Sequence, residues 1–266
     1  MTSVSFLPCR SDKDISPTGY ARYQSDVAVS QYCDAHYGPD KFGVANFSAT
    51  LARLCISELN HLSQCRALDL GCAVGRSAFE LATCFDQVDA VDFSSRFIDI
   101  ARRIQKSGWV HYRLIEEGNL ISDRKMSLAD LGLKESADKV CFSQGNAQDL
   151  EPRCRDYQLV LAANLVDRLT SPGRFLSEIH QQLVPGGLLV IASPYDWLEK
   201  FTPQKQWLGG RYRTGRPLDS LSGLEEKLGR HFALCREPRE LEFVIHKTGR
   251  TFNHSISQVT FWQRHG

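Results

Sequence analysis

The sequence lacks several features that would assign it to particular classes of protein. No apolar run approaches the roughly 18 residues of a membrane-spanning helix, and no basic segment followed by an apolar core indicates a secretory signal. The formal net charge is only +1 over 266 residues, which gives no general attraction toward nucleic acid or anionic lipid. We therefore expect a cytoplasmic protein that acts on a small molecule, with no nucleic-acid partner and no membrane partner.

Paired cysteines are also missing, although cysteine itself is abundant. The nine cysteines are scattered and form no C-x-x-C pair, so no metal site is expected. An odd number of cysteines without an export signal indicates reduced thiols, and we expect most of these small side chains to be buried.

The length and composition fit one large globular domain. Residues 1–23 are polar and interrupted by two prolines, which predicts a flexible N-terminal segment. We expect residues 24–266 to form a single domain, with an inserted β-hairpin within about 107–138 and a lid over about 193–216.

Strand-like and helix-like patterns alternate along the chain, which predicts an α/β fold with a parallel sheet. Helices are expected at 25–37, 44–60, 75–84, 94–106, 172–183 and about 218–229. Strands are expected at 65–70, 87–92, 139–144, 157–163 and 188–192, with long closing strands at about 231–247 and 251–263.

The most informative stretch is the strand, turn and helix around residues 67–77. The turn does not fit the G-x-G-x-x-G fingerprint of dinucleotide sites. It resembles instead the D-x-G-x-G-x-G turn of class I S-adenosylmethionine (SAM) methyltransferases, with Ala73 at the middle glycine position. Its candidate cofactor-binding residues are Asp69, Gly71, Cys72, Ala73, Gly75 and Arg76. The alternative is an ordinary strand-turn-helix with chance glycines.

Each part of SAM requires a different partner. Asp69 and the turn backbone suit the ammonium and carboxylate, and Asp92 at the end of the next strand suits both ribose hydroxyls. Phe93 is expected to wall the adenine, and Asn146 and Ala147 to lie at its amino group. Asn146 as a simple turn residue is the alternative.

Two further segments are candidates for the acceptor side of the site. Asn164, Asp167 and Arg168 follow the buried strand at 157–163, where ligands bind in open α/β sheets, and Asn164 is expected to contact the cofactor as well. The alternative for the charged pair is a surface ion pair. Residues 193–216 are rich in aromatic and basic side chains, which predicts a lid for a small ligand with a carboxylate and a flat ring. The alternative is a packing flap.

Several longer motifs resemble the methyltransferase of ovothiol biosynthesis. They are Tyr32–Gly38, Leu68–Arg76, Ala163–Leu169, Ser193–Glu199, Thr202–Gly210 and Ser257–Trp262. That domain is usually the C-terminal part of a longer protein with an iron-dependent sulfoxide synthase, so a functional pairing with such a synthase is implied. The sequence leaves open whether this chain is a stand-alone enzyme, which Met1 mildly favours, or an excised domain.

The resemblance implies a class I fold, with a seven-stranded, mostly parallel sheet and an antiparallel final hairpin. It also implies SAM-dependent N-methylation of 5-thiohistidine (4-mercaptohistidine) on the ring nitrogen nearest the side chain, which yields ovothiol A and S-adenosylhomocysteine. The acceptor for the far ring N–H is expected among Asn164, Asp167, Tyr195 and Asp196. A donor for the sulfur is expected among His36, Tyr37, Lys200, Arg211 and Arg213.

The full set of expected substrate-binding residues is His36, Tyr37, Arg168, Tyr195, Trp197, Lys200, Trp207, Arg211 and Arg213. Two other functions remain open at this point. One is methylation of another small aromatic, amine or thiol acceptor, and the other is a non-catalytic SAM-binding regulator.

Overall fold

The computed structural model describes residue 23 and residues 25–59, 65–152 and 154–266. Apart from Tyr23, the predicted flexible segment at residues 1–23 lies outside the described residues. No helix in the described residues is long and apolar enough to cross a membrane.

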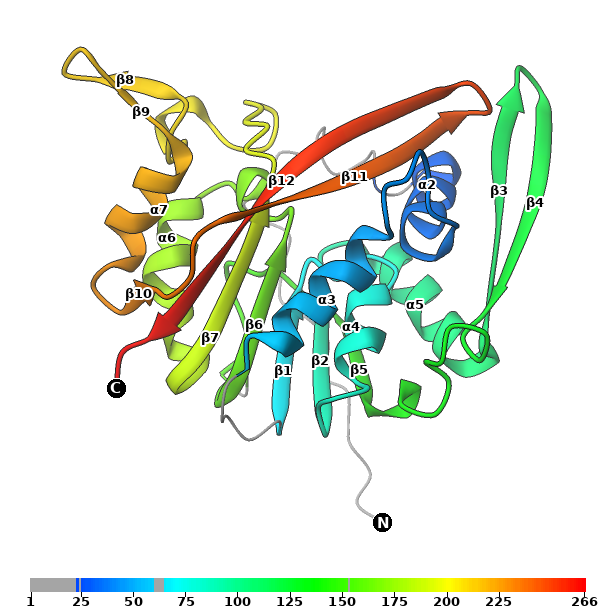
Figure 1. The fold of residues 1–266 in the computed structure, drawn as a ribbon, viewed down its shortest axis with the longest axis horizontal. Helices are drawn as coiled ribbons and strands as arrows, with labels where there is room; N and C mark the ends of the chain where they lie inside the picture. Colours follow the sequence, from blue (N-terminus) through cyan, green and yellow to red (C-terminus); the bar gives the residue numbers. More distant parts are fainter. Residues whose placement is uncertain (1–22, 24, 60–64, 153) are drawn as a thin grey trace.

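A mostly parallel central sheet organises the chain (Figure 1). Its order is β10-β12-β7-β6-β1-β2-β5, with β11 also paired to β12. β1, β2, β5, β6 and β7 pair in parallel, and β12 is antiparallel to β7, β10 and β11. The strands are β1 (Arg66–Leu70), β2 (Gln87–Asp92), β5 (Val140–Gln144), β6 (Tyr157–Ala163), β7 (Leu183–Ser193), β10 (Phe232–Leu234), β11 (Arg239–Thr248) and β12 (Thr251–Arg264). The α/β prediction is confirmed.

One strand prediction is wrong, and it changes the strand count from seven to eight. The pattern at 231–247 is not one strand but two, β10 and β11, separated by residues 235–238. Pro238 has no backbone N–H to donate to a ladder, which explains a break there. Both pieces pair with β12, so together they fill the single edge position expected for one strand.

Helices cover both faces of the sheet. They are α2 (Asp26–Tyr37), α3 (Phe47–Ser57), α4 (Arg76–Leu81), α5 (Ser95–Ser107), α6 (Pro172–Glu178) and α7 (Ser220–Leu228). The helices α2, α3, α4 and α5 pack on one face of the sheet through one core cluster. The helices α6 and α7 pack on the other face through a second cluster. In β6, Leu159 and Leu161 belong to the first cluster while Val160 and Ala162 belong to the second, as expected for a strand buried on both faces.

Helix boundaries agree with the sequence to within a few residues. Ser94 caps the start of α5, because its hydroxyl accepts a hydrogen bond from the Phe97 amide at 3.2 Å. The helix predicted at 172–183 ends earlier, at Glu178, and continues as the 3-10 turn Ile179–Gln181. β7 then begins at Leu183 rather than at the predicted residue 188.

The predicted insertion is a β-hairpin, formed by β3 (Trp109–Glu117) and β4 (Leu120–Ser127). It is not an unattached surface excursion. The Tyr112 hydroxyl donates to Asp34 of α2 at 3.1 Å. At the far end of the β11–β12 hairpin, the Gly249 amide donates to the Glu116 carbonyl at 2.9 Å. The insertion therefore supports both α2 and the β11–β12 hairpin.

The predicted lid contains more regular structure than a loop. A 3-10 turn, Gln204–Gln206, is followed by a small hairpin of β8 (Arg211–Arg213) and β9 (Arg216–Leu218). This hairpin projects at the opposite end of the molecule from β3 and β4 (Figure 1). The cysteine prediction also needs correction: of the eight described cysteines three are buried, and Cys65 and Cys141 are exposed.

The turn after β1 has an unusual backbone. Gly71 and Gly75 have φ of +74° and +91°, and Ala73 between them has φ of +47°. A side chain in this left-handed region is strained, typically by about 1–3 kcal/mol. Ala73 therefore stands where glycine would be less strained, and its methyl group carries a cost in stability.

We expect Ala73→Gly to leave stability unchanged or to raise it by up to about 1 kcal/mol, because relief of strain offsets the added freedom of the unfolded chain. Urea unfolding of purified protein measures the difference. Ala78→Gly, inside α4, is the control and should cost at least about 1 kcal/mol. A similar loss in both variants would contradict strain at Ala73.

Candidate active site

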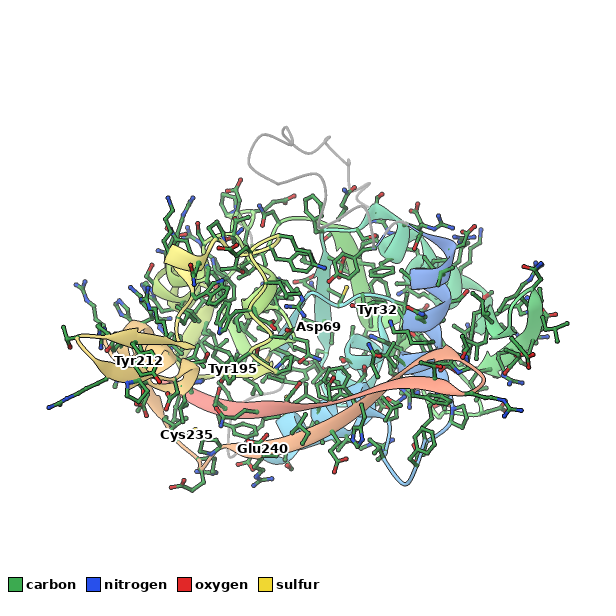
Figure 2. The ribbon with its side chains drawn as sticks, turned by 90° about the horizontal axis from the view of Figure 1, so that it is seen from above. Tyr32, Asp69, Tyr195, Tyr212, Cys235 and Glu240 are labelled. Carbon is green, nitrogen blue, oxygen red and sulfur yellow. The ribbon has the colours of Figure 1, made fainter. Side chains whose placement is uncertain are left out.

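A cavity of about 390 Å³ lies where the carboxyl ends of β1, β2, β5 and β6 meet α2 and the β11–β12 hairpin. Asp69 lies near the centre of the molecule (Figure 2). Most of the predicted cofactor residues line the cavity. They are Asp69, Gly71, Cys72, Ala73, Asp92, Phe93, Asn146, Ala147 and Asn164. Separate strands thus bring these predicted residues together at one sheet edge.

Asp92 connects the turn after β1 to the start of α5. One carboxylate oxygen accepts from the Ala73 amide at 2.9 Å, and the other accepts from the Ser94 amide at 2.8 Å. A carboxylate has about four acceptor positions, so these two bonds leave room for two ribose hydroxyls. Burial raises the Asp92 pKa to about 6, although both amide bonds oppose the rise.

Asp69 is the acid in the cavity that most needs a cationic partner. Its side chain is buried, and one carboxylate oxygen has no hydrogen-bond partner among the described residues. Burial, together with the negative charge of Asp92, raises the Asp69 pKa to about 7. A cationic group that neutralises this pair would remove the cost. The ammonium and sulfonium of SAM fit that requirement.

The backbone of the turn is less available than the sequence indicated. The amides of Gly71 and Cys72 both donate to the Val91 carbonyl, at 2.8 and 3.2 Å, and the Gly75 amide donates to Cys72 at 2.9 Å. With the Ala73 amide bound to Asp92, these donors are already used inside the chain. The turn therefore offers close approach rather than free N–H groups.

Gly75 and Arg76 do not line the cavity, which corrects their predicted role. A Cβ at Gly75 would lie 2.7 Å from the Phe142 ring, so glycine is needed there for packing. The Arg76 guanidinium donates to Glu80 at 2.7 and 2.9 Å and to the His36 carbonyl at 3.2 Å. Arg76 therefore joins α4 to α2.

Asn146 lines the cavity as predicted and also makes a local turn. Its side-chain oxygen accepts from the Gln148 amide at 3.0 Å, which is the turn role considered as the alternative. One lone pair of this oxygen remains for an adenine amino group. Phe93 and Ala147 lie beside it in the lining.

Asn164 stands at the end of β6 with φ of +51°. Its backbone amide donates to the Ala192 carbonyl at 2.7 Å, and its side-chain oxygen accepts from the Ser257 hydroxyl at 2.7 Å. With that oxygen engaged, the side chain presents its NH₂ group to the cavity. Asn164 therefore offers N–H donors to the cavity, while its oxygen keeps one lone pair, so the acceptor role for the substrate ring N–H stays a prediction.

Asp167 is fully buried and does not line the cavity, so its predicted contact with substrate is wrong. It accepts from Arg168 and from the Asp196 amide, both at 3.0 Å. Arg168 donates in turn to the Asp196 carbonyl at 2.7 Å and carboxylate at 3.2 Å. Arg168 and Asp196 do line the cavity, and this network holds the first residues of the lid over it.

The remaining predicted lid residues lie outside the cavity, which corrects their assignment. The Tyr195 hydroxyl donates to Gln258 at 3.2 Å, and the Trp197 and Trp207 indoles donate to Ser220 and Thr202 at 2.9 and 2.8 Å. Trp207, Arg211 and Arg213 line a separate hollow of about 440 Å³, and Arg213 pairs with Glu226. The neighbouring Tyr212 lies at the far edge of the molecule (Figure 2), and Lys200 lies over the Phe201 ring at 5.1 Å.

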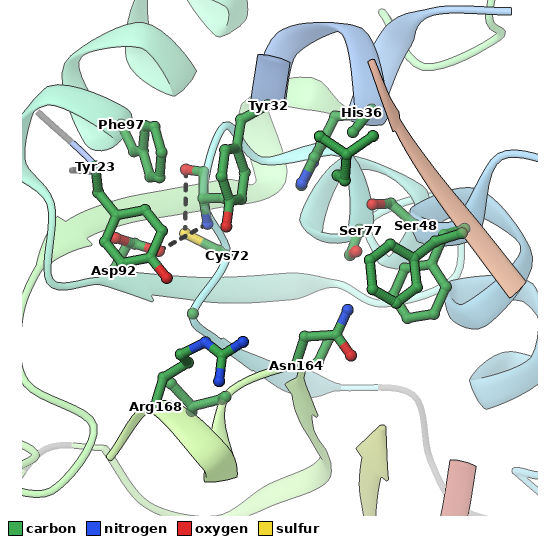
Figure 3. A pocket seen from close by; sticks show the side chains of 18 of the residues that line it. Tyr23, Tyr32, His36, Ser48, Cys72, Ser77, Asp92, Phe97, Asn164 and Arg168 are labelled. Carbon is green, nitrogen blue, oxygen red and sulfur yellow. Dashed lines mark hydrogen bonds between the residues drawn. The ribbon is translucent and has the colours of Figure 1, made fainter. Parts of the chain in front are cut away.

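Of the two substrate-binding residues predicted in α2, only His36 lies at the cavity. His36 lines the cavity (Figure 3), where burial and the nearby Arg76 lower its pKa to about 3. It is therefore a neutral imidazole at physiological pH. Tyr37 does not line the cavity, because its hydroxyl donates to the Val74 carbonyl at 2.7 Å and holds α2 against the turn.

Sequence reasoning missed the wall formed by β11 and β12. Phe243 and Ile245 of β11, with Asn253 and Ser255 of β12, line the cavity. Their alternation along paired strands was visible in the sequence, but only the register of the hairpin shows that this face closes the site. Among the described residues, no group of three or more His, Cys, Asp or Glu side chains could hold a metal ion.

We expect Asp92→Ala to weaken SAM binding by about 1.5–3 kcal/mol, because it removes charge-assisted hydrogen bonds. Calorimetry measures the dissociation constant, and circular dichroism shows whether the variant still folds. The SAM affinity of Asp92→Asn, which keeps one acceptor oxygen, should fall between the affinities of Asp92→Ala and the parent. An unchanged dissociation constant for a folded Asp92→Ala would remove Asp92 from the ribose site.

SAM affinity should also depend on pH. Protonated Asp69 and Asp92 neither attract a cation nor accept as many hydrogen bonds, so affinity should rise as pH increases through about 6 to 7. Below this range the loss should reach about tenfold per pH unit for each carboxyl that must ionise. Calorimetry between pH 5 and 7.5 tests this, and Asp92→Asn should reduce the slope. A flat parent profile would show that neither carboxyl titrates on binding.

The sequence pattern of the methyltransferase domain family matches residues 46–232. No curated protein matches the chain by sequence. Among solved structures, the [4+2]-cyclase SpnF superposes with a TM-score of 0.58 at 14% identity, covering 95% of this chain and 97% of that one. The N-methyltransferase NodS from Bradyrhizobium japonicum WM9, in complex with S-adenosyl-L-homocysteine, gives 0.51 at 13% identity, covering 89% and 98%.

At such low identity these neighbours show the fold alone, and the fold agrees with the strand order described above. The family match covers most of the cavity's strands, including the turn after β1 and the ends of β2 and β6. The chain therefore belongs to the methyltransferase domain family and has the fold of the class I, SAM-dependent methyltransferases.

Proposed function

We propose that this protein methylates the ring nitrogen nearest the side chain of 5-thiohistidine, giving ovothiol A. The proposal extends the family assignment by the motifs shared with the ovothiol methyltransferase. Four of the six motifs contribute cavity residues. Beyond the SAM turn these include His36 of α2, Asn164 and Arg168 after β6, and Asp196 after β7. A motif that places residues in the acceptor half of a site bears on substrate choice, which the SAM turn alone does not.

The observation that carries the proposal is the lining of the cavity beyond the turn. It combines aromatic side chains with neutral polar groups: Phe47 and Phe243 lie with ring centroids 5.4 Å apart, and Ser48, Asn164 and the neutral His36 share the same space. A small polar heteroaromatic ring matches this lining, because its faces pack on aromatic groups and its edges form hydrogen bonds.

SAM when bound supplies a methyl group on a sulfonium, and its transfer breaks that carbon–sulfur bond, forms a carbon–nitrogen bond and leaves S-adenosylhomocysteine. The protein's task is to hold the acceptor in line with this methyl group, since positioning can supply much of the rate. The attacking ring nitrogen must keep its lone pair. The neutral His36 adds no positive charge near it.

The substrate's carbon–sulfur bond must be made by an earlier reaction, which is why a sulfoxide synthase is the proposed functional partner. A thiol substrate also requires a reducing compartment, in agreement with a cytoplasmic location. Docking between the two proteins is not required, because a small substrate can diffuse.

We expect one methyl group to be transferred from SAM to 5-thiohistidine, with ovothiol A identified by mass spectrometry and NMR. Histidine should be a far poorer acceptor, by up to about 10⁴-fold, because groups arranged for sulfur would be left unpaired. Arg213→Ala, remote from the cavity, is the matched control and should keep the parent KM. Equal rates with histidine would favour another small acceptor, and SAM binding without turnover on any acceptor would favour a regulator.

A further inference from the structure

We propose that Asn164, oriented by Ser257, binds the sulfur of the acceptor and directs methylation to the ring nitrogen. This inference rests on the proposed function, because it concerns the thiohistidine in the same site. It assigns the sulfur to a neutral donor at the end of β6 and gives Ser257 a positioning role.

The orientation of the Asn164 amide follows from its contacts. Ser257 is fully buried in β12, and its hydroxyl donates to the Asn164 side-chain oxygen at 2.7 Å. The Asn164 backbone is fixed independently, through its amide bond to Ala192 at 2.7 Å. A side chain held at its oxygen and its backbone has little rotational freedom, so its two N–H donors point where the oxygen does not.

Those donors meet the cavity rather than the protein core. Asn164 lines the cavity opposite His36, and Arg168 lies on the same side of the cavity as Asn164 (Figure 3). Ser257 lies on the same face of β12 as Asn253 and Ser255, because alternate residues of a strand share a face, and both of these also line the cavity. The bond from Ser257 to Asn164 therefore closes the site between β12 and β6.

The other donors expected for the sulfur are in the wrong places. Tyr37 is bound to Val74, and Lys200, Arg211 and Arg213 lie outside the cavity. His36 is present but neutral, so it contributes no charge that would hold a thiolate. Asn164 is a neutral donor at the end of β6, where the residues after the strand border the ligand in this fold.

The contact between Asn164 and the sulfur decides which atom of the substrate receives the methyl group. A thiolate is a stronger nucleophile than a neutral ring nitrogen, so an unrestrained sulfur would take the methyl group. Hydrogen bonds from the Asn164 N–H groups hold the sulfur away from the line of attack and lower its nucleophilicity. The ring nitrogen's electron pair then forms the new carbon–nitrogen bond as the carbon–sulfur bond of SAM breaks. The product is a positively charged ring that carries the negatively charged sulfur, and S-adenosylhomocysteine leaves as a neutral thioether.

The test compares Ser257→Ala, Asn164→Ala and Asn164→Asp with the parent. Calorimetry with S-adenosylhomocysteine-loaded protein measures 5-thiohistidine binding, ultraviolet absorbance against pH reports the pKa of the bound thiol, and NMR identifies the methylated atom. We expect about tenfold weaker binding in Asn164→Ala, a larger loss in Asn164→Asp because a carboxylate repels the thiolate, and a raised thiol pKa in both. Ser257→Ala should bind more weakly and form S-methyl product.

Thr260→Val is the matched control. Thr260 is also fully buried in β12, but its hydroxyl donates to the Ile191 carbonyl at 3.2 Å on the opposite face of the strand. Its loss should lower stability without altering the thiol pKa or the product.

Two outcomes would overturn the inference, and they differ in their meaning for the proposed function. If the parent methylates 5-thiohistidine while all three variants keep its affinity, thiol pKa and purely N-methylated product, the role of Asn164 and Ser257 is wrong and the proposed function stands. If the parent binds SAM but neither binds nor methylates 5-thiohistidine, both are wrong.

Discussion

The carboxylate of Asp92 is the contact on which the rest of the site depends. It holds the turn after β1 through the Ala73 amide and the start of α5 through the Ser94 amide, so two neighbouring strand ends share one anchor. This anchor keeps a strained, positive-φ alanine in place. It also keeps a second buried acid, Asp69, close to a negative charge that raises its pKa. Two buried acids so close together are electrostatically costly, and a cationic ligand stabilises the turn that holds them.

The two halves of the site are built by different parts of the chain. The cofactor half comes from the carboxyl ends of the parallel strands, whose positions follow from the sheet. The proposed acceptor half combines the residues after β6 and β7 with α2 and the long β11–β12 hairpin. The inserted β3–β4 hairpin supports α2 and the β11–β12 hairpin through Asp34 and Gly249. An insertion far from the SAM turn in sequence thus controls the wall that faces the substrate. Changes in β3 and β4 can alter substrate fit without touching the cofactor.

Much of the fold and of the cofactor half followed from the sequence. Buried parallel strands and the glycine turn have strong local signals, so Asp69, Asp92 and Asn164 were placed correctly at one sheet edge. Most of the lid side chains were not placed correctly, because residue type shows what a side chain can bind but not which partner it meets. Arg213 met Glu226 and Trp197 met Ser220, and those partners lie in α7, after the lid in the chain. The β11–β12 wall was missed because its place depends on register and on a break at Pro238.

The hydrogen-bond partners of the polar side chains separate structural groups from functional ones. The side chains of Arg76, Tyr37 and Asp167 looked like ligands in the sequence, yet each makes hydrogen bonds inside the chain that join elements around the cavity. Such bonds stabilise the walls and leave little capacity for a ligand. Asp69 differs, since it lines the cavity and one of its carboxylate oxygens has no hydrogen-bond partner among the described residues. One oxygen of Asp167 also has no partner there, but Asp167 does not line the cavity. Leaving a buried polar group unsatisfied costs about 1–3 kcal/mol, and a cationic ligand that pairs with the Asp69 carboxylate removes that cost. This is the physical ground for expecting the ammonium of SAM at Asp69.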